Sequence, residues 1–232
     1  MRHCPVKEAF WEEFLGMLVQ YDPILVALSV AIAVMGSFTG FVPTSGSASR
    51  PFTTLRLRIL TGAIAIGGSI WSMHFIGMAA VNLPVAVSYD VLLTMISAYA
   101  AIIVTGLALY VCSLKPMSNI RFIVGGVFMG AGISCMHYVG MSAIRAACVL
   151  SYSVPGAMLS VVVAIGASIG ALWFALRSND MTEIALGGLV LGLTISAMHY
   201  IGMFATTFLP VSDLVEVSKP VFSSDTVANI VA

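Results

Sequence analysis

Six long apolar stretches, separated by short polar connectors, make up most of the chain. Beyond its first two residues each stretch has no charge, and each reaches the length of about 20 apolar residues that an α-helix needs to span a bilayer. The stretches cover residues 22–43, 59–81, 89–113, 122–144, 155–176 and 184–208. They predict an all-α membrane protein with six transmembrane helices. A last apolar run, residues 227–232, is a candidate start of a seventh helix.

The basic residues of the connectors predict an orientation. The connectors after the first, third and fifth stretches hold Arg50, Arg56, Arg58, Lys115, Arg121 and Arg177, whereas those after the second, fourth and sixth hold Arg145 and Lys219. Cytoplasmic loops of membrane proteins are rich in Lys and Arg. The first three connectors are therefore expected to be cytoplasmic, with the N-terminus outside.

Composition narrows the partners and the chemistry. Of the 232 residues, 59% are hydrophobic and 9% are charged, far from the balance of a soluble domain. This apolar composition makes the lipid bilayer the expected partner. The formal net charge is zero, so a nucleic acid is not expected as a partner. The four cysteines lack CxxC spacing, which indicates neither a disulfide framework nor a zinc finger. The sequence shows neither a nucleophile–base pair nor a phosphate-binding loop in a plausible place, so we do not expect an enzyme.

A hexapeptide that begins with Met-His and ends with Gly-Met occurs three times, at the same place in the second, fourth and sixth stretches. The copies are residues 73–78, 136–141 and 198–203, and they recur roughly every 62 residues. Glycines stand seven and twelve residues before each histidine of the hexapeptide, and an alanine six residues after it. Such coincidences indicate internal duplication. We expect one domain over residues 1–232, built from three parallel two-helix repeats at approximately 22–84, 89–147 and 155–210.

Each copy of the hexapeptide carries one imidazole and two thioethers. On a helix, the His and the Met four residues later share a face, whereas the Met before the His points about 100° away. The candidate metal ligands are Met73, His74, Met78, Met136, His137, Met141, Met198, His199 and Met203. Because the three helices run in one direction, the histidines are expected at one depth, in the outer half of the bilayer. Whether they form one shared site or three separate sites stays open.

The types of donor indicate a soft metal. No Asp or Glu lies in the stretches beyond their first two residues, so calcium or magnesium would lack ligands near the motif, and zinc usually recruits Cys or carboxylates beside His. Neutral imidazoles and thioethers suit Cu(I). Haem held by His and Met is one alternative. The other is no cofactor at all, in which case the motif only packs helices.

Residues near the motif carry further predictions. Four aromatic residues near the expected membrane surfaces are candidates for an interfacial belt: Trp71, Tyr89, Tyr152 and Trp173. Ser134 and Ser196 stand one helical turn before their histidines. They are expected either to orient the imidazole or simply to be small.

With three Met–His copies in alternate membrane helices, the chain resembles the MHYT domain, a sensor module of bacterial integral membrane proteins. The resemblance covers nearly the whole chain. The Thr of that motif is replaced by Ile76, Val139 and Ile201, and its Tyr by Phe75 in the first copy. The family is proposed to bind copper through Met and His and to sense oxygen, carbon monoxide or nitric oxide. The resemblance therefore implies copper at the nine residues named above.

The resemblance also implies a place in signalling. MHYT domains are usually joined to cytoplasmic output domains such as diguanylate cyclases or cyclic di-GMP phosphodiesterases. We therefore expect a non-enzymatic sensor input domain of the bacterial inner membrane, with a cytoplasmic output domain and a homodimeric partner as candidates. The alternatives are a Cu(I) transporter or channel, which predicts ligands spread through the depth of the membrane, and a haem-binding membrane protein.

Overall fold

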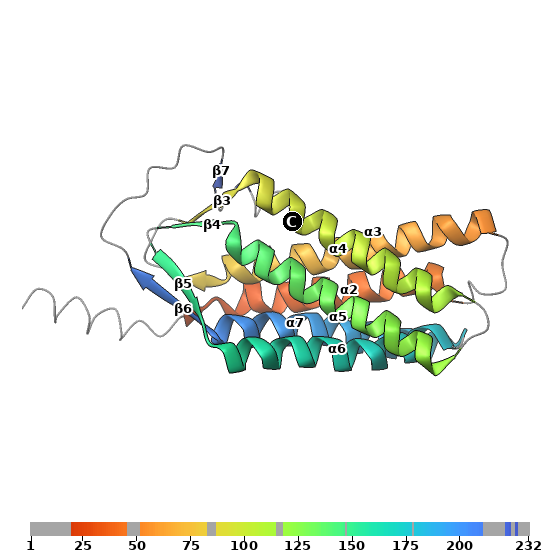
Figure 1. Ribbon diagram of the computed structural model, residues 1–232. Coiled ribbons are helices and arrows are strands. Elements are labelled where there is room, and N and C mark those ends of the chain that lie inside the picture. The colour runs from red at the N-terminus through yellow and green to blue at the C-terminus, as the bar shows by residue number, and fades with distance from the viewer. Residues whose placement is uncertain are drawn as a thin grey trace, which may run out of the picture.

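Six long helices run along a common axis in the computed structural model (Figure 1), which describes residues 20–45, 52–82, 87–114, 118–146, 148–177, 179–210, 221–223 and 226. The helices are α2 (Pro23–Thr44), α3 (Phe52–Ala79), α4 (Val91–Ser113), α5 (Asn119–Ser142), α6 (Val154–Arg177) and α7 (Met181–Phe204). All six are long and apolar enough to cross a membrane. This confirms the six-helix prediction. The candidate start of a seventh helix, residues 227–232, lies outside the described residues and stays a prediction.

Inner and outer helices alternate around a closed ring. Each helix packs against its neighbours in the chain, and α2 packs against α7, so the ring closes. The helices α3, α5 and α7 also contact one another across the centre. Their membrane-spanning windows are 61%, 56% and 56% buried, compared with 28%, 28% and 33% for α2, α4 and α6. The three helices that carry the hexapeptide therefore form the core of the bundle.

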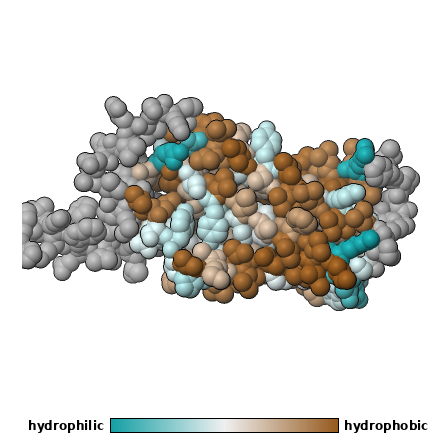
Figure 2. All heavy atoms as spheres, in the orientation of Figure 1, coloured by the Kyte–Doolittle hydropathy of each residue, from teal (hydrophilic) through white to brown (hydrophobic). Residues whose placement is uncertain are grey.

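The outer surface is that of a membrane protein. Figure 2 shows hydrophobic residues over most of the length of the bundle and the strongly hydrophilic ones near its two ends. Large apolar side chains on the outer helices are well exposed, among them Ile24 at 76% and Leu92 at 67%. In water such a surface would cause aggregation. In a bilayer it faces lipid, as the apolar stretches predicted.

Short strands, which the sequence pattern did not predict, close each helix pair at one end of the bundle. Three antiparallel pairs form: β1 (Gln20–Tyr21) with β2 (Val81–Asn82), β3 (Ser88–Asp90) with β4 (Ile144–Arg145), and β5 (Cys148–Tyr152) with β6 (Thr206–Pro210). A further strand, β7 (Val221–Ser223), pairs with the free edge of β3. Each of the three pairs joins the start of an outer helix to the end of the inner helix that follows it.

The alanine six residues after each histidine of the motif accepts the same hydrogen bond in every repeat. The backbone N–H groups of Asp22, Asp90 and Ser153 donate to the carbonyls of Ala80, Ala143 and Ala205, each at 2.8 Å. Asp22 and Asp90 also cap the first turns of α2 and α4 with their carboxylates. One residue therefore starts the outer helix and ties it to the end of its inner partner.

Helix α3 begins at Phe52, earlier than the expected start at residue 59. Arg56 and Arg58 therefore lie on its first turns and not in the connector. Arg58 donates from Nη1 to the carbonyl of Ser45 at 3.3 Å, which ties α3 to the end of α2. Long basic side chains keep their charge at the membrane surface while the stem follows the helix, so these charges did not end the helix.

Two of the four residues expected in an aromatic belt are buried instead. Trp71 is only 9% exposed, and its Nε1 donates to the carbonyl of Thr94 in α4 at 3.2 Å. Tyr89 is 4% exposed and packs edge-on against Phe75. The belt prediction was wrong for both, because Trp71 stands on an inner helix and Tyr89 in a strand that covers the bundle end. Tyr152 is 37% exposed.

Candidate metal centre

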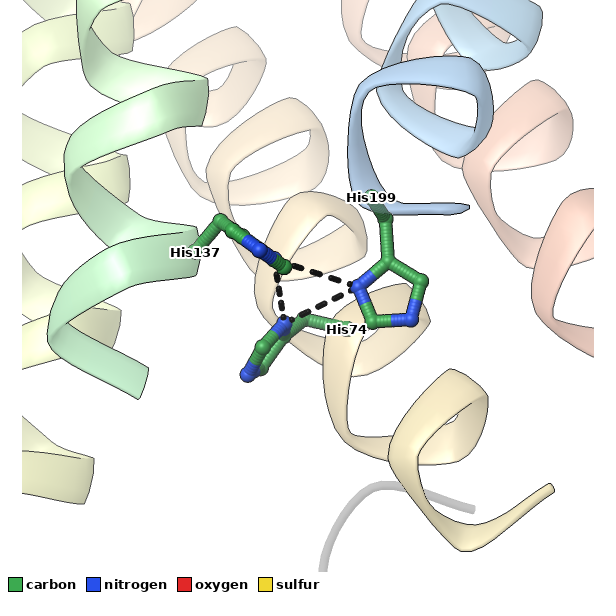
Figure 3. Close-up of side chains that lie close together, drawn as sticks. All are labelled: His74, His137 and His199. Carbon is green, nitrogen blue, oxygen red and sulfur yellow. Dashed lines mark hydrogen bonds between the residues drawn. The ribbon is translucent and has the colours of Figure 1, made fainter. Parts of the chain in front are cut away.

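His74, His137 and His199 meet at the centre of the bundle (Figure 3). Each stands on the last turns of an inner helix, and the internal duplication puts it at the same position in each repeat. Because α3, α5 and α7 surround the ring centre, the three side chains arrive from three sides at one level. They are 0%, 0% and 1% exposed. The histidines therefore share a single place and do not form three separate ones.

The Nδ1 atoms are the ones that converge. The distances are 3.2 Å between His74 and His199, 3.3 Å between His74 and His137, and 3.3 Å between His137 and His199. The centre of this triangle lies about 1.9 Å from each nitrogen, the side divided by the square root of three, close to a metal–imidazole bond of about 2.0 Å. The ring planes are nearly perpendicular, at 85° to 90°. The arrangement is a three-bladed propeller with its nitrogens inward.

Hydrogen bonds alone do not satisfy this triangle. A neutral imidazole carries one ring proton, so each Nδ1 is either a donor or an acceptor. Among three such atoms at least two are of the same kind, and those two repel each other. A cation at the centre would accept all three lone pairs at once and remove the conflict. The residues present therefore fit a metal ion held by three nitrogens.

The outer nitrogen of each histidine is seated on a glycine of another repeat. A Cβ atom built on Gly140 would lie 2.5 Å from Nε2 of His74. A Cβ atom on Gly202 would lie 2.6 Å from Nε2 of His137, and a Cβ atom on Gly77 would lie 2.6 Å from Nε2 of His199. No Nε2 has a hydrogen-bond partner among the described residues. With the proton on Nε2, the Nδ1 lone pair faces the centre.

This seat is the functional feature that sequence reasoning missed. From spacing alone, a glycine three residues after each His indicates a small edge of the helix that admits another helix backbone. In the structure it admits an imidazole. The available signal was that all three copies of the hexapeptide have glycine at this position. Which histidine lies against which glycine depends on the order of the helices around the ring.

The six motif methionines are buried directly before and one turn after each histidine. None of Met73, Met78, Met136, Met141, Met198 and Met203 is more than 4% exposed. They make the surroundings of the triad apolar and stay predicted ligands. The other members of the predicted set are the three histidines. Among the His, Cys, Asp and Glu residues that the structure describes, they form the group that lies close enough together to hold a metal ion.

The serines one turn before the histidines do not orient the imidazoles. The Oγ atoms of Ser134 and Ser196 donate to the carbonyls of Gly130 and Gly192 on their own helices, both at 2.9 Å. A serine that bonds back to the preceding turn needs no other partner. Of the two interpretations of these serines, the small side chain is the one that fits the structure.

Tyrosines next to the triad link the inner helices α5 and α7 to the outer helices that follow them around the ring. The hydroxyl of Tyr138 lies 2.9 Å from Oγ of Ser160, and that of Tyr200 lies 2.8 Å from Oγ of Ser29. The two tyrosine rings also pack edge-on against the imidazoles of the preceding histidines, with centroids 4.9 Å apart. In the first repeat Phe75 has no hydroxyl to offer. There the indole of Trp71 links α3 to α4 in its place.

The family model described as a bacterial signalling protein N-terminal repeat, MHYT, matches the chain at residues 67–125 and 130–188. The chain belongs to the MHYT family. Membership confirms the resemblance drawn from the hexapeptide. Both matches begin at the glycine seven residues before a triad histidine, His74 or His137. His199 of this MHYT domain lies outside the matched residues, yet it occupies the third corner of the same triangle.

Several bacterial proteins are similar to this MHYT domain. The bifunctional diguanylate cyclase/cyclic di-GMP phosphodiesterase MucR of Pseudomonas aeruginosa is 34% identical over 83% of the chain. The signaling protein YkoW of Bacillus subtilis is 32% identical over 82% of the chain, and the cyclic di-GMP phosphodiesterase NbdA of Pseudomonas aeruginosa is 32% identical over 80%. The chain spans 29% of the length of MucR and 24% of YkoW and NbdA. No solved structure matches the chain.

Proposed function

We propose that this MHYT domain is a membrane sensor that holds one Cu(I) ion between His74, His137 and His199 and regulates cyclic di-GMP turnover. The observation that carries the proposal is the triangle of Nδ1 atoms, 3.2 to 3.3 Å on a side, at the buried centre of the bundle. The names of MucR and NbdA supply the cyclic di-GMP context. The signalling output would belong to a cytoplasmic domain of the full-length protein.

The donor set favours Cu(I) over other metals. The three ligands are neutral, and the described residues place no carboxylate among them. A divalent ion buried without a compensating charge costs more to desolvate than a monovalent one. Cu(I) also accepts thioether ligands, and a methionine stands beside each histidine. Haem is disfavoured, because nitrogens 3.3 Å apart leave no room for a porphyrin between them.

A sensor explains the core of the bundle better than a transporter. Four and eight residues before each histidine, the inner helices carry only apolar side chains. These are Ile70, Ile133 and Ile195, then Ile66, Met129 and Leu191, all at most 1% exposed. They form two buried apolar layers between the triad and the far end of the bundle. An ion that passed through would have to leave its nitrogens for hydrocarbon, which supports retention and not transport.

The signal would be a diatomic gas or the copper itself. A Cu(I) ion held by the three histidine nitrogens would keep a coordination position for oxygen, carbon monoxide or nitric oxide. A ligand shifts a conformational equilibrium only by its different affinities for the two states. The changed coordination would act on the imidazoles, and the tyrosines beside them would pass the movement to α2 and α6.

The distribution of charge supports a placement in the bacterial inner membrane with the N-terminus outside. The end of the bundle without strands carries Arg56, Arg58, Arg121 and Arg177, and the strand end carries Arg145. Because cytoplasmic ends are rich in Lys and Arg, the strand end and the triad would face the periplasmic side.

Elemental analysis of protein purified from copper-replete cells tests the proposal. We expect one copper per chain and no Soret band in the visible spectrum. Replacing any one histidine, for example His137→Ala, is expected to remove nearly all of the copper, because the site is shared. His3→Ala is the matched control and should keep the metal. A wild-type protein without copper, or loss of only part of it in each variant, would contradict the shared copper site.

A further inference from the structure

A groove opens between α3 and α4 in the half of the bundle away from the strands. Its volume is about 470 Å³, within the range of about 300–1,000 Å³ for small-molecule sites. The walls are apolar and include Ile59, Ala63 and Ile102. Arg56 and Tyr110 also line it. Since α3 begins and α4 ends at the same end of the bundle, these two polar side chains stand together there.

The other two interfaces of this kind are closed at the same level. Eleven residues before the triad histidine, α5 carries Gly126 and α7 carries Gly188. A Cβ on Gly126 would lie 2.6 Å from Cα of Ile169 in α6. A Cβ on Gly188 would lie 2.8 Å from Cα of Phe38 in α2. In both cases a glycine of the inner helix touches the backbone of an outer helix that carries a large side chain.

Between α3 and α4 the small and large residues have changed places. The equivalent of the inner glycine is Ala63, and the equivalent of Ile169 on the outer helix is Gly106. A Cβ on Gly106 would meet only Cβ of Ala63, at 3.4 Å. The alanine holds the helices apart, and the glycine provides no side chain to fill the space. Divergence between the repeats is therefore the physical origin of the groove.

We propose that this groove binds one acyl chain of an anionic phospholipid, whose phosphate is held by Arg56. The rim is open to the bilayer, since Leu60 is 53% and Ile103 is 60% exposed. An apolar groove that opens into lipid favours an apolar occupant. The guanidinium and the Tyr110 hydroxyl lie at the end where a headgroup would stand, and basic pockets between membrane helices bind anionic headgroups. The inference is independent of the metal.

The groove can be closed by restoring the residue pattern of the neighbouring interface. The double change Ala63→Gly with Gly106→Ile puts a glycine on α3 opposite an isoleucine on α4, as Gly126 stands opposite Ile169. Native mass spectrometry of the full chain, titrated with dioleoyl phosphatidylglycerol in detergent, should count one tightly bound lipid on the wild type and none on the double variant. Gly166→Ile, at an exposed site with no neighbouring atom within 4 Å, is the matched control and should keep the lipid.

A second variant tests the headgroup. The wild type should prefer phosphatidylglycerol to dioleoyl phosphatidylcholine by about fivefold, the effect of one basic side chain at a membrane surface. Arg56→Gln should abolish that preference and Arg56→Lys should retain it. Equal binding of the two lipids by the wild type, or an unchanged preference in Arg56→Gln, would overturn the assignment to Arg56. Displacement of the lipid by inorganic phosphate would identify a phosphate site instead, and binding unchanged in the double variant would place the lipid elsewhere.

Discussion

Each histidine of the triad is seated by a glycine of a different repeat, in cyclic order. His74 lies on Gly140, His137 lies on Gly202, and His199 on the glycine of the first repeat. Every inner helix therefore supplies one imidazole and seats another. The triangle of nitrogens forms only when all three repeats are packed, so the candidate metal centre and the bundle core depend on the same contacts.

Adding one methyl group to a seat is expected to disturb the metal site. In Gly140→Ala the new Cβ would lie 2.5 Å from Nε2 of His74, closer than carbon and nitrogen approach, so the imidazole must move. Loss of groups that position ligands typically weakens metal binding by roughly 10–100-fold. Competition with a Cu(I) chelator measures the affinity. Gly68→Ala, with nothing within 4 Å, is the control, and equal affinities in the two variants would show that the seat is not needed.

Tyr89 is expected to make stability depend on alkaline pH. This side chain lies in β3, outside the membrane helices, and burial raises its pKa from 10.0 to about 12. The unfolded chain would lose the phenolic proton first, so the contribution of Tyr89 is complete below pH 10 and is lost as the pH rises toward 12. Unfolding at several pH values measures this. Tyr89→Phe should flatten the decline, whereas Tyr99→Phe, at a lipid-facing position, should leave it unchanged.

At the scale of the elements, each repeat is closed on itself and linked to the next. The strand pairs and the shared backbone hydrogen bond close a repeat at one end. The tyrosines reach in the other direction, from an inner helix to the outer helix of the following repeat. Tyr138 and Tyr200 therefore join the triad to the outer helices α6 and α2, because their rings pack on the imidazoles and their hydroxyls contact Ser160 and Ser29.

The tyrosine links are expected to stabilise the bundle modestly. Removing the hydroxyl in Tyr138→Phe, the partner in Ser160→Ala, and both together gives a double-mutant cycle. Hydrogen bonds between membrane helices average about 0.6 kcal/mol of coupling, so we expect a coupling energy of this size in thermal or denaturant unfolding. Copper content should stay the same in all three variants. A coupling energy near zero would mean that the 2.9 Å contact does not hold the helices together.

At the scale of the whole molecule, the features that depend on local pattern were predictable from the sequence. Apolar length predicted six spans, and duplication predicted that the three histidines share one depth. The strands are too short, at two to five residues, to show an alternating pattern. The seating of His74 on Gly140 depends on the order of the helices around the ring, which spacing does not encode. The buried Ser29 and Ser160 were missed because their helices carry no hexapeptide. Their shared position was a usable signal, since each stands seven residues after the residue, Asp22 or Ser153, whose N–H donates to the alanine at the end of the inner helix.

The position of the triad along the bundle predicts one-sided access to the metal. His137 stands five residues before the end of α5 and 18 after its start, which at about 1.5 Å per residue is roughly 8 Å from the strand end and about 27 Å from the other. The two apolar layers lie on the longer path. In liposomes that contain copper-loaded protein, an impermeant Cu(I) chelator outside should therefore strip only molecules whose strand end faces outward. Protease digestion of exposed connectors measures that fraction. Removal of all the copper from intact liposomes, or uptake of copper into their lumen, would mean that the ion crosses the layers around Ile133 and that the domain is a transporter.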